Sequence, residues 1–141
     1  MIKLATYWLS TGLLAAAIFS GGLAELILRR EAVQGMSELG YPAYFVQLIG
    51  FWKVMAALTL LAPRLPRLKE WAYAGIFFNM TGAAISHAAT GSAAWHLPLT
   101  LSFAMLTLVS WLLRPSDRAL GELPVHSGSG REVRANAYAE A

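Results

Sequence analysis

The sequence contains no cysteine among its 141 residues, and this absence excludes several kinds of chemistry. A chain without thiols has no disulfide relay, no thiolate nucleophile and no thiolate ligands for iron–sulfur clusters or Cys-rich zinc sites. Charged residues are also scarce, at 13% of the chain, whereas soluble domains have about a quarter. Because 57% of the residues are hydrophobic, the composition indicates a membrane protein.

The sequence also has no evident internal repeat. Its length suits one domain of four spans, since each crossing of the bilayer needs about 20 residues. Apolar stretches of that length lie at 4–28, 43–62, 71–89 and 94–113. Between the first two, charged and apolar residues alternate at helical spacing, which predicts a short interfacial helix. We therefore predict an all-α fold: a four-transmembrane-helix bundle at residues 1–115, then a polar, disordered cytoplasmic tail at 116–141.

The first stretch has a rival interpretation as a signal peptide. Lys3, the Leu/Ala-rich run and the small residues at 15–17 imitate the three regions of such a segment. The apolar run is longer than the 7 to 15 residues of a signal core, which favours a membrane span. Cleavage would leave three spans.

The basic residues predict the orientation. Lys3, the turn at 63–70 and the tail hold most of them, whereas the opposite side of a four-span path has Arg29 and Arg30. The positive-inside rule then places both termini in the cytoplasm, in a multi-pass protein of a bacterial inner membrane. The net charge of +3 is explained by anionic lipid, so we expect no nucleic-acid partner. Aromatic residues fit two interfacial belts, an inner one of Tyr7, Trp8, Trp71, Tyr73 and Trp111 and an outer one of Tyr41, Tyr44 and Trp95.

Five polar residues in or beside the spans are candidates for a ligand-binding site: Glu25, Lys53, Asn79, His87 and His96. Ionisable groups in hydrocarbon are costly unless they meet a partner or a wet cavity, so they indicate function. At about 1.5 Å per residue, Lys53 and Asn79 lie near the midplane and the other three near the outer surface. The sequence leaves open whether Glu25 pairs with Lys53 or with a histidine.

Each candidate also has a structural interpretation. Lys53 can extend along its stem towards water, Glu25 and His96 can lie in the interface, and His87 can cap a helix end. Asn79 can join two helices by hydrogen bonds.

Helical spacing places these residues on stripes with small neighbours, and we expect the four stripes to face one another. Their members are Ala17, Gly21 and Glu25; Val46, Gly50, Lys53 and Ala57; Gly75, Asn79, Gly82 and Ser86; and His96, Thr100, Phe103, Thr107 and Ser110.

Two cofactor interpretations involve the histidines. His87 and His96 on adjacent helices could supply two axial ligands to haem, but the surrounding positions are small and polar and no attachment motif is present. Glu25, His87 and His96 could together bind a divalent metal. We disfavour both, and assign no metal ligand and no catalytic residue.

Several motifs resemble the DoxX-like family of small four-span membrane proteins. They are Gly-Gly-Leu-Ala-Glu at 21–25, Leu-Gly-Tyr-Pro at 39–42, Gly-Phe-Trp-Lys at 50–53, the run Pro-Arg-Leu-Pro-Arg-Leu-Lys-Glu-Trp at 63–71, and the segment 79–87 that ends in Ser-His. The resemblance spans about residues 7–115 and implies a compact four-helix membrane domain. Relatives in the broader superfamily include a subunit of an archaeal thiosulfate:quinone oxidoreductase, proteins associated with bacterial redox stress and an animal chaperone for receptor assembly.

The convergence of polar groups favours a non-enzymatic or accessory membrane protein with a polar pocket, open to the outer face, for a small amphipathic ligand such as a quinone. The alternative is a scaffold or assembly partner of a redox or other membrane complex, in which these residues only hold the bundle. Proton or solute transport is less favoured, because the four spans show no inverted repeat or broken helix. No reaction can be assigned from these residues.

Overall fold

The computed structural model describes residues 2–91 and 94–120, and every regular element in these ranges is helical. The elements are α1 (Ile2–Leu26), α2 (Arg30–Glu38), α3 (Ala43–Leu61), α4 (Pro66–Thr90), α5 (His96–Leu112) and the 3-10 turn η1 (Ser116–Arg118). The predicted all-α fold, with four long helices and a short helix after the first, is confirmed. The part of the predicted disordered tail at 121–141 lies outside the described residues, as does Ser92.

Proline and glycine set several helix boundaries. Gly40 and Gly91 have φ angles of +86° and +64°, which glycine adopts without the steric cost that other residues meet. They follow α2 and α4, where a left-handed residue ends a helix. Pro42 is the N-cap of α3, and Pro66 is the first residue of α4, a position that tolerates the missing N–H.

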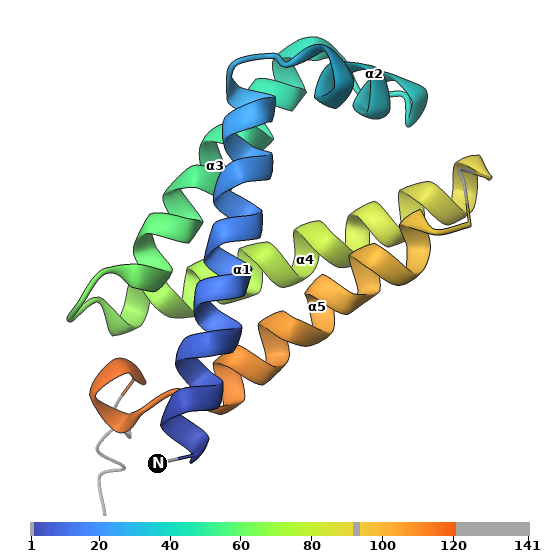
Figure 1. Ribbon diagram of the computed structural model, residues 1–141. Helices are drawn as coiled ribbons and strands as arrows, with labels where there is room; N and C mark the ends of the chain where they lie inside the picture. Colours follow the sequence, from blue (N-terminus) through green and yellow to red (C-terminus); the bar gives the residue numbers. More distant parts are fainter. Residues whose placement is uncertain (1, 92–93, 121–141) are drawn as a thin grey trace, which may run out of the picture.

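The long helices form two hairpin-like pairs that cross each other (Figure 1). Helix α1 packs along α3, and α4 packs along α5. We call the end with the start of α1, the α3–α4 turn and the end of α5 the basic end, because Lys3, Arg64, Arg67, Lys69, Arg114 and Arg118 belong to it. The two pairs meet towards the basic end and diverge towards the other end, which carries α2 (Figure 1).

Two glycines bring α1 and α3 into backbone contact. A Cβ added to Gly22 would lie 2.6 Å from the Cβ of Lys53 and 3.0 Å from the carbonyl oxygen of Gly50. A Cβ added to Gly50 would lie 2.6 Å from the backbone nitrogen of Leu26. Small residues allow this approach, which lets packing hold the pair together where lipid offers no hydrophobic drive.

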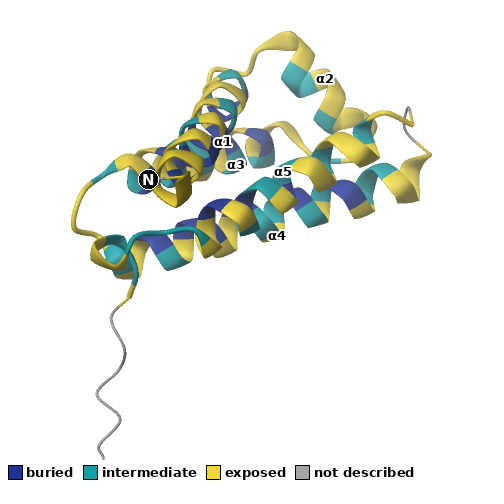
Figure 2. Cartoon of the chain, turned by 60° about the horizontal axis from the view of Figure 1, so that its bottom comes forward, coloured by how far each residue is buried: buried dark blue, intermediate teal, exposed yellow. Residues whose placement is uncertain are grey.

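The core lies where the two pairs cross. It includes Leu14, Ala15, Ile18, Ala57, Leu60, Ala72, Tyr73, Ile76, Met80 and Ala104. Buried residues are confined to the inward faces of the long helices, while α2 is half-buried or exposed throughout (Figure 2). The outward faces carry many large apolar side chains, such as Trp71, Phe78 and Ile85, which are 70–77% exposed. Such a surface suits lipid better than water.

Length and composition identify α1 and α3, within the described ranges, as helices able to cross a membrane. Helix α5 is apolar but shorter, with 17 residues. Helix α4 has 25 residues, and its first turn carries Arg67 and Lys69, so its apolar part starts near Trp71.

The predicted stripes on α3 and α5 are confirmed, whereas those on α1 and α4 are shifted by about one position. On α1, Gly22 is buried and Gly21 is exposed. On α4, the buried face consists of Ala72, Tyr73, Ile76, Met80 and Ala84, while Gly75 and Gly82 are exposed. Gly75 lines a cavity instead of packing against a helix, which explains why its small size misled the prediction.

Candidate functional site

The acidic and basic groups of α1 and α3 form a buried ion pair. Lys53 Nζ lies 2.5 Å from Glu25 Oε1, and the two side chains are 17% and 11% exposed. The close approach of the helices at Gly22 and Gly50 brings the pair together. Glu25 therefore pairs with Lys53 and not with a histidine. Its second oxygen, Oε2, is buried and has no hydrogen-bond partner among the described residues.

Lys53 and Asn79 share a cavity between α3 and α4. This α3–α4 cavity has a volume of about 370 Å³, within the range of small-molecule sites. Asn79 Nδ2 is buried, with no hydrogen-bond partner in the described part of the chain. A lysine and an asparagine from two different helices thus line the same cavity, as their predicted depths suggested.

The rest of the α3–α4 cavity is almost entirely apolar. Its walls include Trp52, Met55, Trp71, Ile76 and Met80. One further polar residue, Thr59, lines it, and its hydroxyl donates to the carbonyl of Met55 at 2.8 Å. Because Leu68 and Trp71 also line it, the cavity extends from Lys53 towards the basic end.

A second, smaller cavity of about 200 Å³ lies on another side of Lys53. Its lining comes from all four long helices and includes Ala17, Gly21, Thr100 and Phe103. Lys53, Ile18 and Met80 line both cavities. Lys53 therefore lies between two cavities.

His87 and His96 meet each other across the α4–α5 turn. Their rings stack in parallel, with centroids 4.4 Å apart and planes inclined by 6°. The ring of Trp95 lies 3.8 Å from that of His96. Neither histidine lines the two cavities described above, so the structure does not join this pair to Lys53 and Asn79.

This arrangement does not fit the cofactor interpretations of the histidines. Two axial ligands of a haem must point their ring nitrogens at an iron between them, whereas these rings face each other in van der Waals contact. No group of three or more His, Asp or Glu side chains within residues 2–91 and 94–120 could hold a metal ion. The triad of Glu25, His87 and His96 is therefore not assembled.

Lys69, which the sequence analysis did not single out, is fully buried at the basic end. Its ammonium donates to the carbonyl oxygens of Thr59 and Leu60 at 2.7 Å and of Ala62 at 2.5 Å. Carbonyls at a helix C-terminus lack intrahelical donors and carry a partial negative charge. Lys69 therefore caps the C-terminus of α3 and holds the start of α4 against it.

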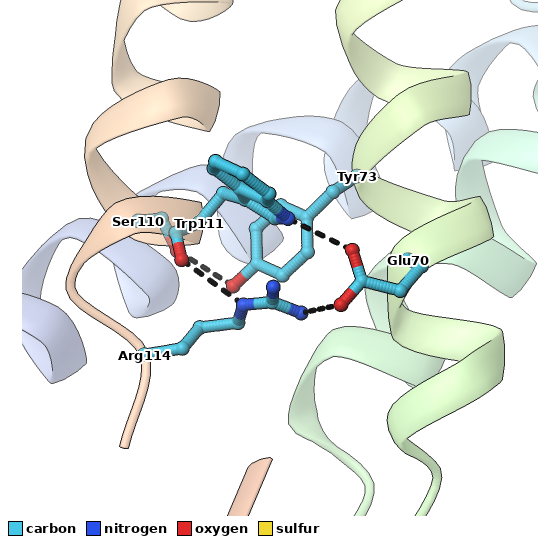
Figure 3. A network of polar contacts seen from close by, with 5 residues as sticks. All are labelled: Glu70, Tyr73, Ser110, Trp111 and Arg114. Atoms are coloured by element: carbon cyan, nitrogen blue, oxygen red, sulfur yellow. Dashed lines mark hydrogen bonds and ion pairs between the residues drawn. The ribbon is translucent and has the colours of Figure 1, made fainter. Parts of the chain in front are cut away.

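A second polar group joins α4 to α5 at the same end (Figure 3). Arg114 Nη1 lies 2.7 Å from Glu70 Oε1, and the indole Nε1 of Trp111 donates to Glu70 Oε2 at 2.8 Å. Burial acts to raise the pKa of Glu70, but the hydrogen bonds from Arg114 and Trp111 outweigh it, and the pKa is lowered. Glu70 precedes the apolar part of α4.

Buried hydroxyl groups continue this network across the bundle. The Ser110 hydroxyl is hydrogen-bonded to that of Tyr73 at 2.8 Å (Figure 3) and to that of Thr11 at 2.7 Å. Arg118 of η1 donates to the carbonyl of Leu60 at 3.3 Å. Tyr73 is thus a buried member of this network and not part of an interfacial belt, and Tyr7 is also buried.

Some of these missed residues had a signal in the sequence. The buried positions 73, 76 and 80 of α4, extended backwards by one step of four, reach Lys69. The predicted third span began at residue 71, so this extension was not made. The pairing of Glu70 with Arg114, 44 positions apart, had no local signal, because it depends on how α4 and α5 pack.

Together these features define a small helical protein with a lipid-compatible surface and a buried ion pair beside an apolar cavity. The chain belongs to the DoxX-like family, whose model matches residues 9–110. This match confirms the resemblance seen in the motifs. It also confirms the prediction that the chain is a membrane protein of this family. No curated protein and no solved structure gives a significant match to the chain.

Proposed function

We propose that this protein binds a small amphipathic molecule, such as a quinone, in the α3–α4 cavity. It does so as a non-enzymatic or accessory membrane protein, with four spans and both termini on the cytoplasmic side of a bacterial inner membrane. The observation that supports this function is that Lys53 and Asn79 line one cavity whose other walls are almost entirely apolar. The basic end then faces the cytoplasm, as the positive-inside rule requires.

The cavity has the two parts that an amphipathic ligand needs. The ammonium of Lys53 and the free amide nitrogen of Asn79 are donors for a carbonyl oxygen of the head group. Met55, Ile76 and Met80 offer apolar surface to a hydrocarbon tail, and flexible methionines adapt to irregular shapes. Polar groups that fix orientation within apolar walls are typical of small-molecule sites.

Glu25 has a supporting role in this proposal. A lone ammonium at this depth would be costly, and the carboxylate compensates it while leaving further N–H donors for the ligand. His87 and His96 line neither cavity, so we assign them no contact with the ligand in this site.

Tryptophan fluorescence provides a direct test, because Trp52 and Trp71 line the cavity. We expect a decyl-substituted benzoquinone to quench the fluorescence of the protein in lipid nanodiscs in a saturable way. Lys53→Met should weaken the apparent affinity by at least about tenfold, the equivalent of one hydrogen bond to a charged group. Lys3→Met, which removes an exposed lysine of α1, should leave it unchanged. Equal affinities for the wild type and Lys53→Met would contradict the proposal.

A further inference from the structure

Lys53 lines the α3–α4 cavity, and its ammonium is paired with Glu25, which lies behind it and does not line the cavity. We propose that Glu25 restricts the site to uncharged heads that accept hydrogen bonds, and excludes carboxylate and phosphate heads. This inference rests on the proposed function, because it concerns the same cavity. It adds the chemical class of the ligand and identifies Glu25 as the residue that determines it.

The first step is the charge of the pair. Glu25 and Lys53 are in direct contact and mostly buried, so the positive charge of the ammonium is already balanced. Among the residues that line the α3–α4 cavity, Lys53 alone is charged. Lys69, the buried lysine in the first turn of α4, has its ammonium directed at three carbonyl oxygens. An anionic head would therefore enter without a free cation to meet it.

The second step concerns the unpaired carboxylate oxygen. Glu25 Oε2 is buried and has no donor within residues 2–91 and 94–120, so part of the negative charge of Glu25 is not compensated by hydrogen bonds there. An anion bound at Lys53 would lie within a few ångströms of this oxygen in a region of low dielectric constant, where like charges repel strongly. A neutral carbonyl group meets no such repulsion.

The third step is the direction of the hydrogen bonds. Asn79 Nδ2 is a buried donor that has no partner in the part of the chain that the structure describes, and the lysine side chain has donors and no acceptor. The head group must therefore accept hydrogen bonds, as a ketone, quinone or ester oxygen does. A hydrocarbon without such an oxygen would leave these donors unsatisfied, which costs affinity.

Two probes of similar tail length separate these classes: the decyl-substituted benzoquinone and dodecanoate. Dodecanoate is titrated as a competitor of the quinone in the nanodisc fluorescence assay at neutral pH. In the wild type we expect dodecanoate to bind at least about tenfold more weakly than the quinone. In Glu25→Gln, which leaves an uncompensated ammonium, dodecanoate should gain at least about tenfold in affinity. Glu31→Gln, an exposed carboxylate of α2, is the matched control and should change neither affinity.

The outcomes distinguish this inference from the function on which it rests. Saturable quinone binding with equally tight dodecanoate binding in the wild type would overturn the inference and leave the proposed function standing. An unchanged preference in a folded Glu25→Gln would also overturn it. If Glu25→Gln does not fold, the comparison of the two probes in the wild type decides. The absence of saturable binding of the quinone to the wild type would overturn both proposals.

Discussion

At the scale of single residues, Lys69 shows how one side chain fixes two helices. Its ammonium satisfies three carbonyl oxygens at the end of α3 from its position in the first turn of α4. We expect Lys69→Met to lower the free energy of unfolding by about 3 kcal/mol, because buried acceptors lose a charged donor. Unfolding in mixed detergent micelles measures this change. Arg67→Met, an exposed neighbour, is the control, and an equal loss in both variants would contradict the role of Lys69.

Glu70 should make stability depend on pH. Its pKa is lower in the folded protein than the ordinary 4.5, so the folded state binds the proton less tightly than the unfolded chain. Its stabilising contribution is therefore complete above pH 4.5 and is lost as pH falls through the folded pKa. We expect Glu70→Gln to be less stable than the wild type at pH 7, with a difference that shrinks as pH falls below 4.5 and through the folded pKa of Glu70. A difference that stays constant between pH 7 and pH 3.5 in thermal unfolding would refute this.

At the scale of elements, the contact of α1 with α3 depends on two positions without side chains. We expect Gly50→Ala to lower the free energy of unfolding by about 1–3 kcal/mol, because its Cβ would meet backbone atoms of α1 that cannot move away cheaply. Gly21→Ala is the control, since nothing lies within 4 Å of its added Cβ and alanine favours the helix. Unfolding in detergent should show that the changes in the free energy of unfolding of the two variants differ in sign or clearly in size. Equal changes would contradict the backbone contact between α1 and α3.

Helices and their ends could be predicted from the sequence better than the faces they bury. The length of the apolar stretches predicted the four long helices, and Gly40, Pro42 and Gly91 marked boundaries through their backbone preferences. The buried faces of α3 and α5 followed from helical spacing. The buried faces of α1 and α4 did not follow from helical spacing, because a small residue does not have one meaning. Gly22 marks a close contact between helices, whereas Gly75 lines a cavity.

At the scale of the whole molecule, the two helix pairs are joined unevenly. Near the basic end, the hydrogen bonds of Thr11, Lys69 and Arg118 cross from one pair to the other. Towards the α2 end, the bond between the hydroxyl groups of Tyr41 and Ser86, at 2.9 Å, joins α4 to the segment that precedes α3. We infer that the pairs move against each other more freely at the α2 end, where they diverge (Figure 1).

Spin labels can measure this difference cleanly, because the chain has no native cysteine. The pair Leu4 and Leu112 reports on the basic end, and the pair Leu23 and Leu99 on the α2 end; all four side chains are exposed. We expect double electron–electron resonance in nanodiscs to give a broader distance distribution for the second pair. Equal widths would show that the bundle is held as firmly at both ends.

The candidate site could be predicted only in part, for reasons of three-dimensional packing. Depth along a helix placed Lys53 and Asn79 at one level, because the rise per residue is fixed. The choice of Lys53 as the partner of Glu25 depended on the contact at Gly22 and Gly50, which no local pattern specifies. The shape of the cavity depends on the crossing of the helix pairs, and this crossing has no signal in a single sequence.

The central claim is that an amphipathic molecule lies between α3 and α4 with its head at Lys53. A benzoquinone whose decyl tail carries a photoreactive diazirine tests this most directly, by cross-linking in native membranes and mass spectrometry of the labelled peptides. The account predicts labels on lining residues such as Met55, Ile76 and Met80, which excess unlabelled quinone suppresses. Labels spread over the exposed apolar faces, without suppression by competitor, would contradict it.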